Sequence, residues 1–94
     1  MMMPVHPGRI LKRELAARDL SANALALSLR VASGRITDIL NGHRAVTPDT
    51  ALRLGRYFGN NPRFWMNLQT NYDLKRAAAE SGKDIVRQVR PHAA

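Results

Sequence analysis

The chain has 94 residues, enough for one domain with one modest hydrophobic core. Fifteen Lys and Arg residues against seven Asp and Glu residues give a net charge of +8, which favours a polyanionic partner, either nucleic acid or an anionic membrane surface. Because there is no cysteine, disulfides, thiolate nucleophiles and thiolate metal sites are excluded. The sequence has no apolar run of the roughly 20 residues that a membrane span needs. Its first residues lack the basic segment followed by an apolar stretch that marks a signal peptide. We therefore expect a cytoplasmic protein without a membrane partner.

Apolar residues recur at helical spacing, and no window alternates like a half-buried strand, which predicts an all-α fold. Pro7 suits the first position of a helix that runs to about Arg18. Ser21 is a good N-cap for a second helix that ends near Leu29. After a break that begins at Arg30, a third short helix is predicted up to Asn41-Gly42.

Two further helices begin with a capping residue followed by proline. Thr47-Pro48-Asp49 opens a fourth helix that ends at Gly59-Asn60, and Asn61-Pro62 opens the longest one. We expect this fifth helix to end near Glu80, before Ser81-Gly82. Residues 1–82 then form the domain, and residues 83–94 are a tail that could be a sixth short helix, an edge strand or disordered.

The second and third predicted helices have the pattern of a helix-turn-helix, in which the second helix can enter the major groove of DNA. Ala26 is small enough for a close crossing, and Val31 in the turn is apolar and can fill the angle between the helices. Ile36 and Leu40 anchor the reading helix from beneath, which leaves its other positions facing outward.

The outward positions are polar or small and suit contacts with DNA. The predicted base-reading residues are Ser33, Gly34, Arg35, Thr37 and Asp38, since arginine can bind a guanine edge and aspartate can accept from cytosine. The predicted phosphate-binding residues are Ser21, Ala22, Asn41, His43 and Arg44.

A family resemblance covers about residues 6 to 75 and is far more specific than a lone helix-turn-helix. It is carried by His6-Pro7-Gly8, Ile10-Leu11, Arg35-Ile36, Asn41-Gly42-His43-Arg44, Val46-Thr47, Asp49-Thr50-Ala51-Leu52-Arg53-Leu54, Arg56-Tyr57-Phe58-Gly59, Pro62, Phe64-Trp65, Asn67-Leu68-Gln69 and Tyr72-Asp73-Leu74. On these residues the chain is similar to HigA-type (VapI-like) antitoxins of the XRE/Cro-C1 helix-turn-helix superfamily. The resemblance implies a five-helix, lambda-repressor-like domain that dimerises, represses its own operon and neutralises a RelE/HigB-like ribonuclease toxin.

The sequence departs from the superfamily pattern at two positions of the turn. Arg30 occupies the place of a usual glycine, which predicts a non-glycine residue in the left-handed region. Ala32 stands where a Ser or Thr often caps the reading helix, so that Ser33 could take over this cap and be lost to base contact.

The fifth helix carries an aromatic-rich stripe that serves either the core or a dimer seam. We predict that Phe64, Trp65, Leu68 and Tyr72 contribute to a two-fold interface, which would suit a palindromic operator. His6, His43 and His92 lack metal-ligand spacing, and the sequence shows no catalytic constellation, so we expect no metal, no cofactor and no enzymatic activity.

The predicted function is that of a sequence-specific DNA-binding antitoxin and transcriptional autorepressor. Three alternatives stay open: a stand-alone phage-type XRE repressor, a toxin-binding module with weak DNA binding, and the ribonuclease toxin itself, which would need strands.

Overall fold

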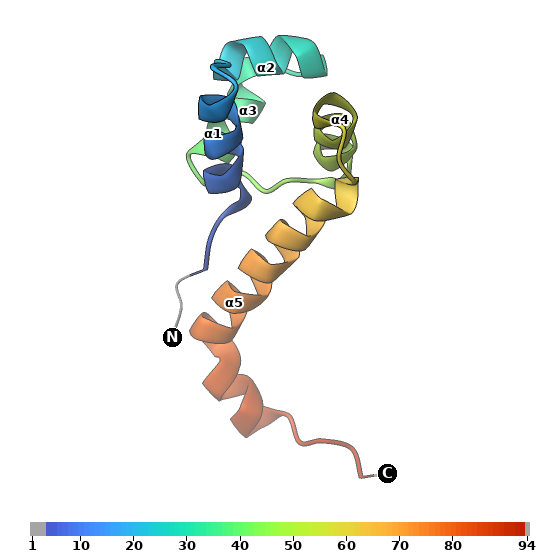
Figure 1. The fold of residues 1–94 in the computed structure, drawn as a ribbon. Coiled ribbons are helices and arrows are strands. Elements are labelled where there is room, and N and C mark those ends of the chain that lie inside the picture. The colour runs from blue at the N-terminus through green and yellow to red at the C-terminus, as the bar shows by residue number, and fades with distance from the viewer. Residues whose placement is uncertain (1–3, 94) are drawn as a thin grey trace.

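Residues 4–93, which the computed structural model describes, form five α-helices joined by short connections (Figure 1). The helices are α1 (Pro7–Ala17), α2 (Ala22–Leu29), α3 (Ser33–Leu40), α4 (Pro48–Phe58) and α5 (Pro62–Gln88). This confirms the predicted all-α, five-helix class. None of the described helices combines the length and the apolar content that crossing a bilayer requires.

Four of the five helices begin with a side-chain cap. The Oγ of Ser21 accepts from the amide of Ala24 at 3.0 Å, and the Oγ1 of Thr47 accepts from the amide of Thr50 at 3.4 Å. His6 and Asn61 cap α1 and α5 in the same way, each followed by proline at the first helical position. These caps satisfy amides that have no partner within the helix, which is why the predicted starts agree with the observed ones.

The first four helices also end alike, with a left-handed residue just after each. These residues are Asp19, Arg30, Gly42 and Gly59, with φ between 51° and 77°. In each case the next amide reaches back to a carbonyl of the last turn, for example from Val31 to Ala26 at 3.0 Å. Such an ending satisfies two carbonyls and turns the chain sharply.

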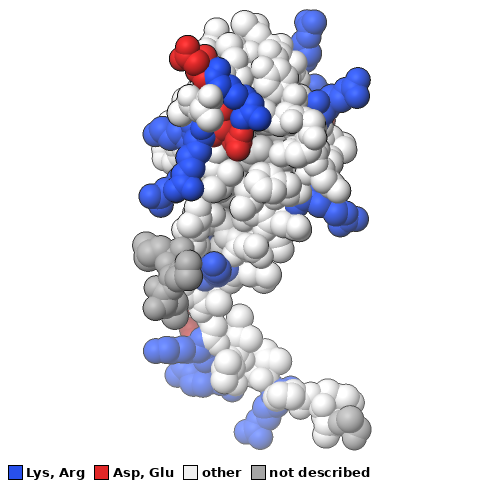
Figure 2. Space-filling view, in the orientation of Figure 1, with Lys and Arg blue, Asp and Glu red and all other residues white. Residues whose placement is uncertain are grey.

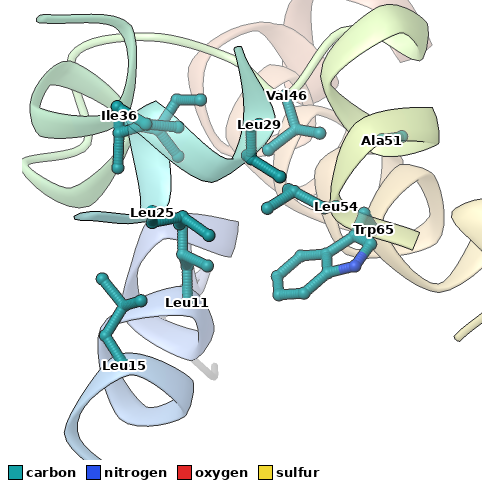
Figure 3. Close-up of a cluster of buried hydrophobic side chains, with 11 residues drawn as sticks. Leu11, Leu15, Leu25, Leu29, Ile36, Val46, Ala51, Leu54 and Trp65 are labelled. Atoms are coloured by element: carbon teal, nitrogen blue, oxygen red, sulfur yellow. The ribbon is translucent and has the colours of Figure 1, made fainter. Parts of the chain in front are cut away.

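The core lies where α1–α4 meet the first part of α5 (Figure 3). Leu11, Leu25, Ile36, Leu54 and Trp65 are all fully buried there. At Gly8 the backbones of α1 and α3 come so close that an added Cβ would lie 1.8 Å from the carbonyl oxygen of Ile39. The N-terminus of α1 is therefore seated directly on the last turn of α3.

The end of α5 differs from the prediction. The helix does not stop at Ser81-Gly82 but continues to Gln88, and its far half extends away from the other helices (Figure 1). A glycine inside a helix costs only about 1 kcal/mol, so it does not end a helix that its neighbours continue. Residues 83–88 are thus helical and belong to α5, and no separate sixth helix or edge strand forms in residues 83–93.

Candidate nucleic-acid interface

The segment from α2 to α3 has the predicted helix-turn-helix geometry. Residues 30–32 form the turn, with Arg30 at φ 61° and ψ 43°, so the expected left-handed arginine is confirmed. Ala26 is only 1% exposed, and Val31 packs against the core from within the turn. A small residue at the crossing and an apolar one in the turn hold the two helices at a fixed angle.

One face of α3 is buried and the opposite face is open. Ile36 and Ile39 are both 0% exposed, and Leu40 packs partly against the same core. Ser33, Gly34 and Thr37 are exposed on the other side, and an added Cβ at Gly34 would meet nothing within 4 Å. We call the outward residues the front of α3 (Ser33, Gly34, Arg35, Thr37 and Asp38). The front is not packed inside the monomer.

The start of α3 has no side-chain cap. Ala32 is the N-cap residue and Ser33 is already the first helical residue, so the expected replacement cap by Ser33 is wrong. The hydroxyl of Thr37 donates to the carbonyl of Ser33 at 3.1 Å. The Ser33 hydroxyl is consequently not committed to capping, and the first amides of α3 keep free hydrogen-bonding capacity toward solvent.

The two charged residues of the front form ion pairs with neighbouring elements. Arg35 Nη1 lies 3.0 Å from Asp49 Oδ2 on α4, and Asp38 lies 3.7 Å from Arg44 in the loop after α3. The sequence placed Asp49 only in the segment that opens the fourth helix and gave no indication of its contact with Arg35. The available signal was Arg53 four residues later, which pairs with the same carboxylate at 2.9 Å.

The predicted phosphate-binding residues lie at the start of α2 and in the loop that follows α3. Ser21 keeps its capping role, while Asn41, His43 and Arg44 are exposed. The loop is anchored at its far end by Gln69 of α5, a buried side chain whose Oε1 accepts from the Val46 amide at 2.8 Å. From the sequence, Gln69 was named only among the residues that carry the family resemblance, without a structural role.

His6 connects the start of α1 to α5 next to this loop. Its Nδ1 accepts from the Gly8 amide at 2.9 Å, and its ring meets that of Tyr72 edge-on at 4.9 Å. Burial lowers the pKa of His6 below its usual 6.5, against the opposing influence of the Arg44 carbonyl and of Asp73. The neutral imidazole is the form that can cap α1.

Basic side chains are spread over the molecule's visible face rather than gathered in one tail (Figure 2). Figure 2 shows Lys and Arg spread over the helical body and along the far half of α5, with few acidic side chains on the same face. Such a distribution supplies long-range attraction to a polyanion, and local contacts must then select the sequence.

The aromatic stripe of α5 is divided between core and surface. Trp65 is 0% exposed and its Nε1 donates to Asn60 at 3.2 Å, so the prediction that Trp65 contributes to a dimer seam is wrong. Phe64, edge-on to Trp65 at 5.1 Å, is 43% exposed, and Leu68 and Tyr72 are partly buried. Adjacent helical positions point about 100° apart, which explains why only one of the two rings enters the core.

The chain is similar to known proteins over nearly its whole length. The helix-turn-helix family model matches residues 11–65. Virulence-associated protein I of Dichelobacter nodosus is 47% identical over 91 residues, which is 96% of this chain and 82% of that protein. Among solved structures, a HigA-family addiction module antidote protein from Coxiella burnetii has a TM-score of 0.95 at 52% identity, covering 97% of this chain and all (100%) of that chain. Pseudomonas aeruginosa antitoxin HigA, solved with the higBA promoter, has a TM-score of 0.93 at 44% identity, covering 96% and 99%.

The helix-turn-helix geometry and the open front of α3 define a DNA-binding protein of the transcription-regulator type. The chain belongs to the helix-turn-helix family, and within it to the HigA-type antitoxins.

Proposed function

We propose that this chain binds a palindromic operator upstream of its own gene as a homodimer, represses that operon and neutralises a RelE/HigB-like toxin encoded beside it. The observation that carries the proposal is the front of α3, whose residues are exposed or partly exposed while Ile36 and Ile39 hold its back in the core. The structure of the Pseudomonas aeruginosa relative with its promoter supports the choice of operator DNA as the ligand. Regulation of this kind takes place in the cytoplasm, and it needs no catalytic residue.

Within this proposal the front of α3 reads bases, and Ser21, Ala22, Asn41, His43 and Arg44 bind the backbone. Arg35 is the strongest candidate reader, because a guanidinium can donate two bonds to one guanine. The amides at the start of α2 and the side chains of the loop after α3 fix the register without reading sequence.

A gel-shift or anisotropy titration tests this assignment. The probes are a duplex of the DNA upstream of the chain's reading frame and a shuffled duplex of equal length. Arg35→Ala should weaken binding to the upstream duplex by about 1–3 kcal/mol and binding to the shuffled duplex much less. Lys83→Ala, which removes one exposed charge on the far part of α5, is the charge-matched control. An equal loss on both duplexes would show that Arg35 binds phosphate instead.

The dimer seam is proposed to include Phe64, Leu68 and Tyr72, with Phe64 the most accessible of the three. Phe64→Glu should shift the chain from dimer to monomer in sedimentation equilibrium at micromolar concentration. Leu74→Glu, which alters another exposed apolar residue of the same helix, is the matched control. A Phe64→Glu variant that stays dimeric would place the seam elsewhere.

The toxin partner is tested by co-expression. If a short RelE-like reading frame adjoins this gene, the two products should co-elute as a stable complex, and this chain should restore growth to cells that express the toxin. Operator binding without any such partner would instead identify a stand-alone repressor, the alternative that shares this fold.

A further inference from the structure

The Arg35 side chain on the front of α3 is held from outside its own helix. Its Nη1 donates to Asp49 Oδ2, in the first turn of α4, at 3.0 Å. A guanidinium has five N–H donors, so this bond leaves four, and two are enough for a bidentate contact with guanine. Long arginine side chains lose rotamer freedom when they bind, and a partner that orders the side chain beforehand reduces that loss.

Asp49 is itself held by a second arginine. The same Oδ2 atom accepts from Arg53 Nε at 2.9 Å, and Arg53 Nη1 donates to the carbonyl of Leu29 at 2.9 Å. That carbonyl lies in the last turn of α2, where backbone oxygens lack helical partners. This series of hydrogen bonds therefore links α2, α4 and α3 and ends at Arg35, the side chain best suited to read a guanine.

The charge of Asp49 matters as much as its geometry. Asp49 is ionised at neutral pH, as any exposed aspartate is, and hydrogen bonds from Arg53 and Arg35 lower its pKa further. It neutralises part of the positive charge of Arg35 and lies 58% exposed beside it, where it repels a DNA phosphate. A guanine edge can use the remaining donors of Arg35, whereas a phosphate must approach this carboxylate.

We propose that Asp49 is a specificity-determining positioning residue, which holds the Arg35 guanidinium in one orientation for a base edge and opposes the use of Arg35 as a phosphate clamp. This inference rests on the proposed operator binding. It assigns a role in discrimination to a residue outside the helix-turn-helix segment, on the helix that follows it.

A double-mutant cycle in DNA binding tests the inference. Dissociation constants of the wild-type chain, Asp49→Ala, Arg35→Ala and the double variant are measured on the upstream duplex and on a shuffled duplex of equal length. Asp49→Ala should lower the ratio of the two affinities by about 3- to 10-fold, through weaker operator binding and tighter binding to the shuffled duplex. In the Arg35→Ala background the same substitution should change the ratio by less than about 2-fold, because Asp49 acts through Arg35.

Glu80→Gln is the matched control. It removes one exposed negative charge and an i,i+4 ion pair, with Arg76, far along α5. This control should tighten binding to both duplexes equally and leave the ratio unchanged. Thermal unfolding of each variant confirms that it is folded under the conditions of the titration.

Two results would overturn the inference while operator binding stands: a ratio that Asp49→Ala leaves unchanged, or an Asp49→Ala effect that is equally large without Arg35. A wild-type chain that does not prefer the upstream duplex would overturn the proposed function itself, and the inference with it.

Discussion

Gly8 shows how a single hydrogen atom in place of a side chain decides the packing of α1 on α3. Replacement by alanine would place a Cβ 1.8 Å from the Ile39 carbonyl oxygen and 2.8 Å from its carbon, both backbone atoms that cannot rotate away. We expect Gly8→Ala to lower the free energy of unfolding by about 3 kcal/mol, the upper part of the range for overpacked sites. Urea denaturation followed by circular dichroism measures the change.

Gly34→Ala is the control for this substitution. Its Cβ would have nothing within 4 Å, and alanine favours a helix by about 1 kcal/mol over glycine, so this variant should be more stable than wild type. A Gly8→Ala variant as stable as wild type would mean that α1 can shift on α3 without loss.

His6 should make stability depend on pH. Burial lowers the pKa of His6 in the folded chain below the 6.5 of an unfolded histidine, so the unfolded state binds protons more readily. The contribution of neutral His6 is present above pH 6.5 and is lost as the pH falls through the window below it. Unfolding free energy measured between pH 8 and 5 (roughly the histidine range) should therefore decline with acidity.

His6→Asn isolates this contribution. Asparagine retains a capping acceptor but does not titrate, so the variant should have a smaller decline over the same pH range, whatever its absolute stability. An equal decline in both proteins would assign the pH dependence to other groups.

The turn between α2 and α3 contains a strained backbone conformation at Arg30, and substitution by glycine should relieve the strain. Arg30 adopts φ 61°, a conformation that costs a non-glycine residue roughly 1–2 kcal/mol, while glycine adopts it freely but loses about 0.5–1 kcal/mol of chain entropy. Arg30→Gly should thus raise the melting temperature by a few degrees in differential scanning calorimetry. Asp19→Gly should raise the melting temperature by less, because aspartate tolerates the left-handed region better than arginine does. A lower melting temperature for Arg30→Gly would show that the arginine side chain makes a stabilising contact larger than the strain.

Elements with local start and stop signals were predictable from the sequence. Ser21, Thr47 and Asn61 each cap a helix as expected, because capping depends on residues two or three positions away. Ser81-Gly82 was misleading, since glycine ends a helix only when the chain beyond it turns away, and here helical residues follow to Gln88.

The contacts of the candidate site depend on packing that local patterns do not contain. Arg35 and Asp49 are 14 positions apart and meet only because α4 lies beside the helix-turn-helix. Which of Phe64 and Trp65 is buried likewise depends on the rotation of α5 against its neighbours. The sequence therefore predicted which residues form the front of α3 but could not predict how its charged members are held.

In the whole molecule, the first half of α5 packs against the other helices and its second half extends away from them (Figure 1). Trp65 and Gln69 are its buried residues, and the molecule measures 52 Å along its longest axis against 25 and 22 Å across. Deletion of residues 83–94, the expected tail, should change the melting temperature of the monomer by less than about 2 °C, because the side chains of residues 83–93 are all exposed. Calorimetry at several protein concentrations measures this, and a large, concentration-dependent decrease would show that the tail takes part in assembly.

The bond between Gln69 and Val46 has a consequence for the length of DNA that two copies could recognise. It fastens the segment behind each reading helix to α5, and Gln69 is fixed in turn by Asp73 at 2.9 Å. If two subunits pair through α5 as proposed, this bond limits how far each reading helix can move relative to the pair. We then expect one base pair inserted at the centre of the palindrome to weaken operator binding, because it rotates one half-site about the DNA axis away from its reading helix.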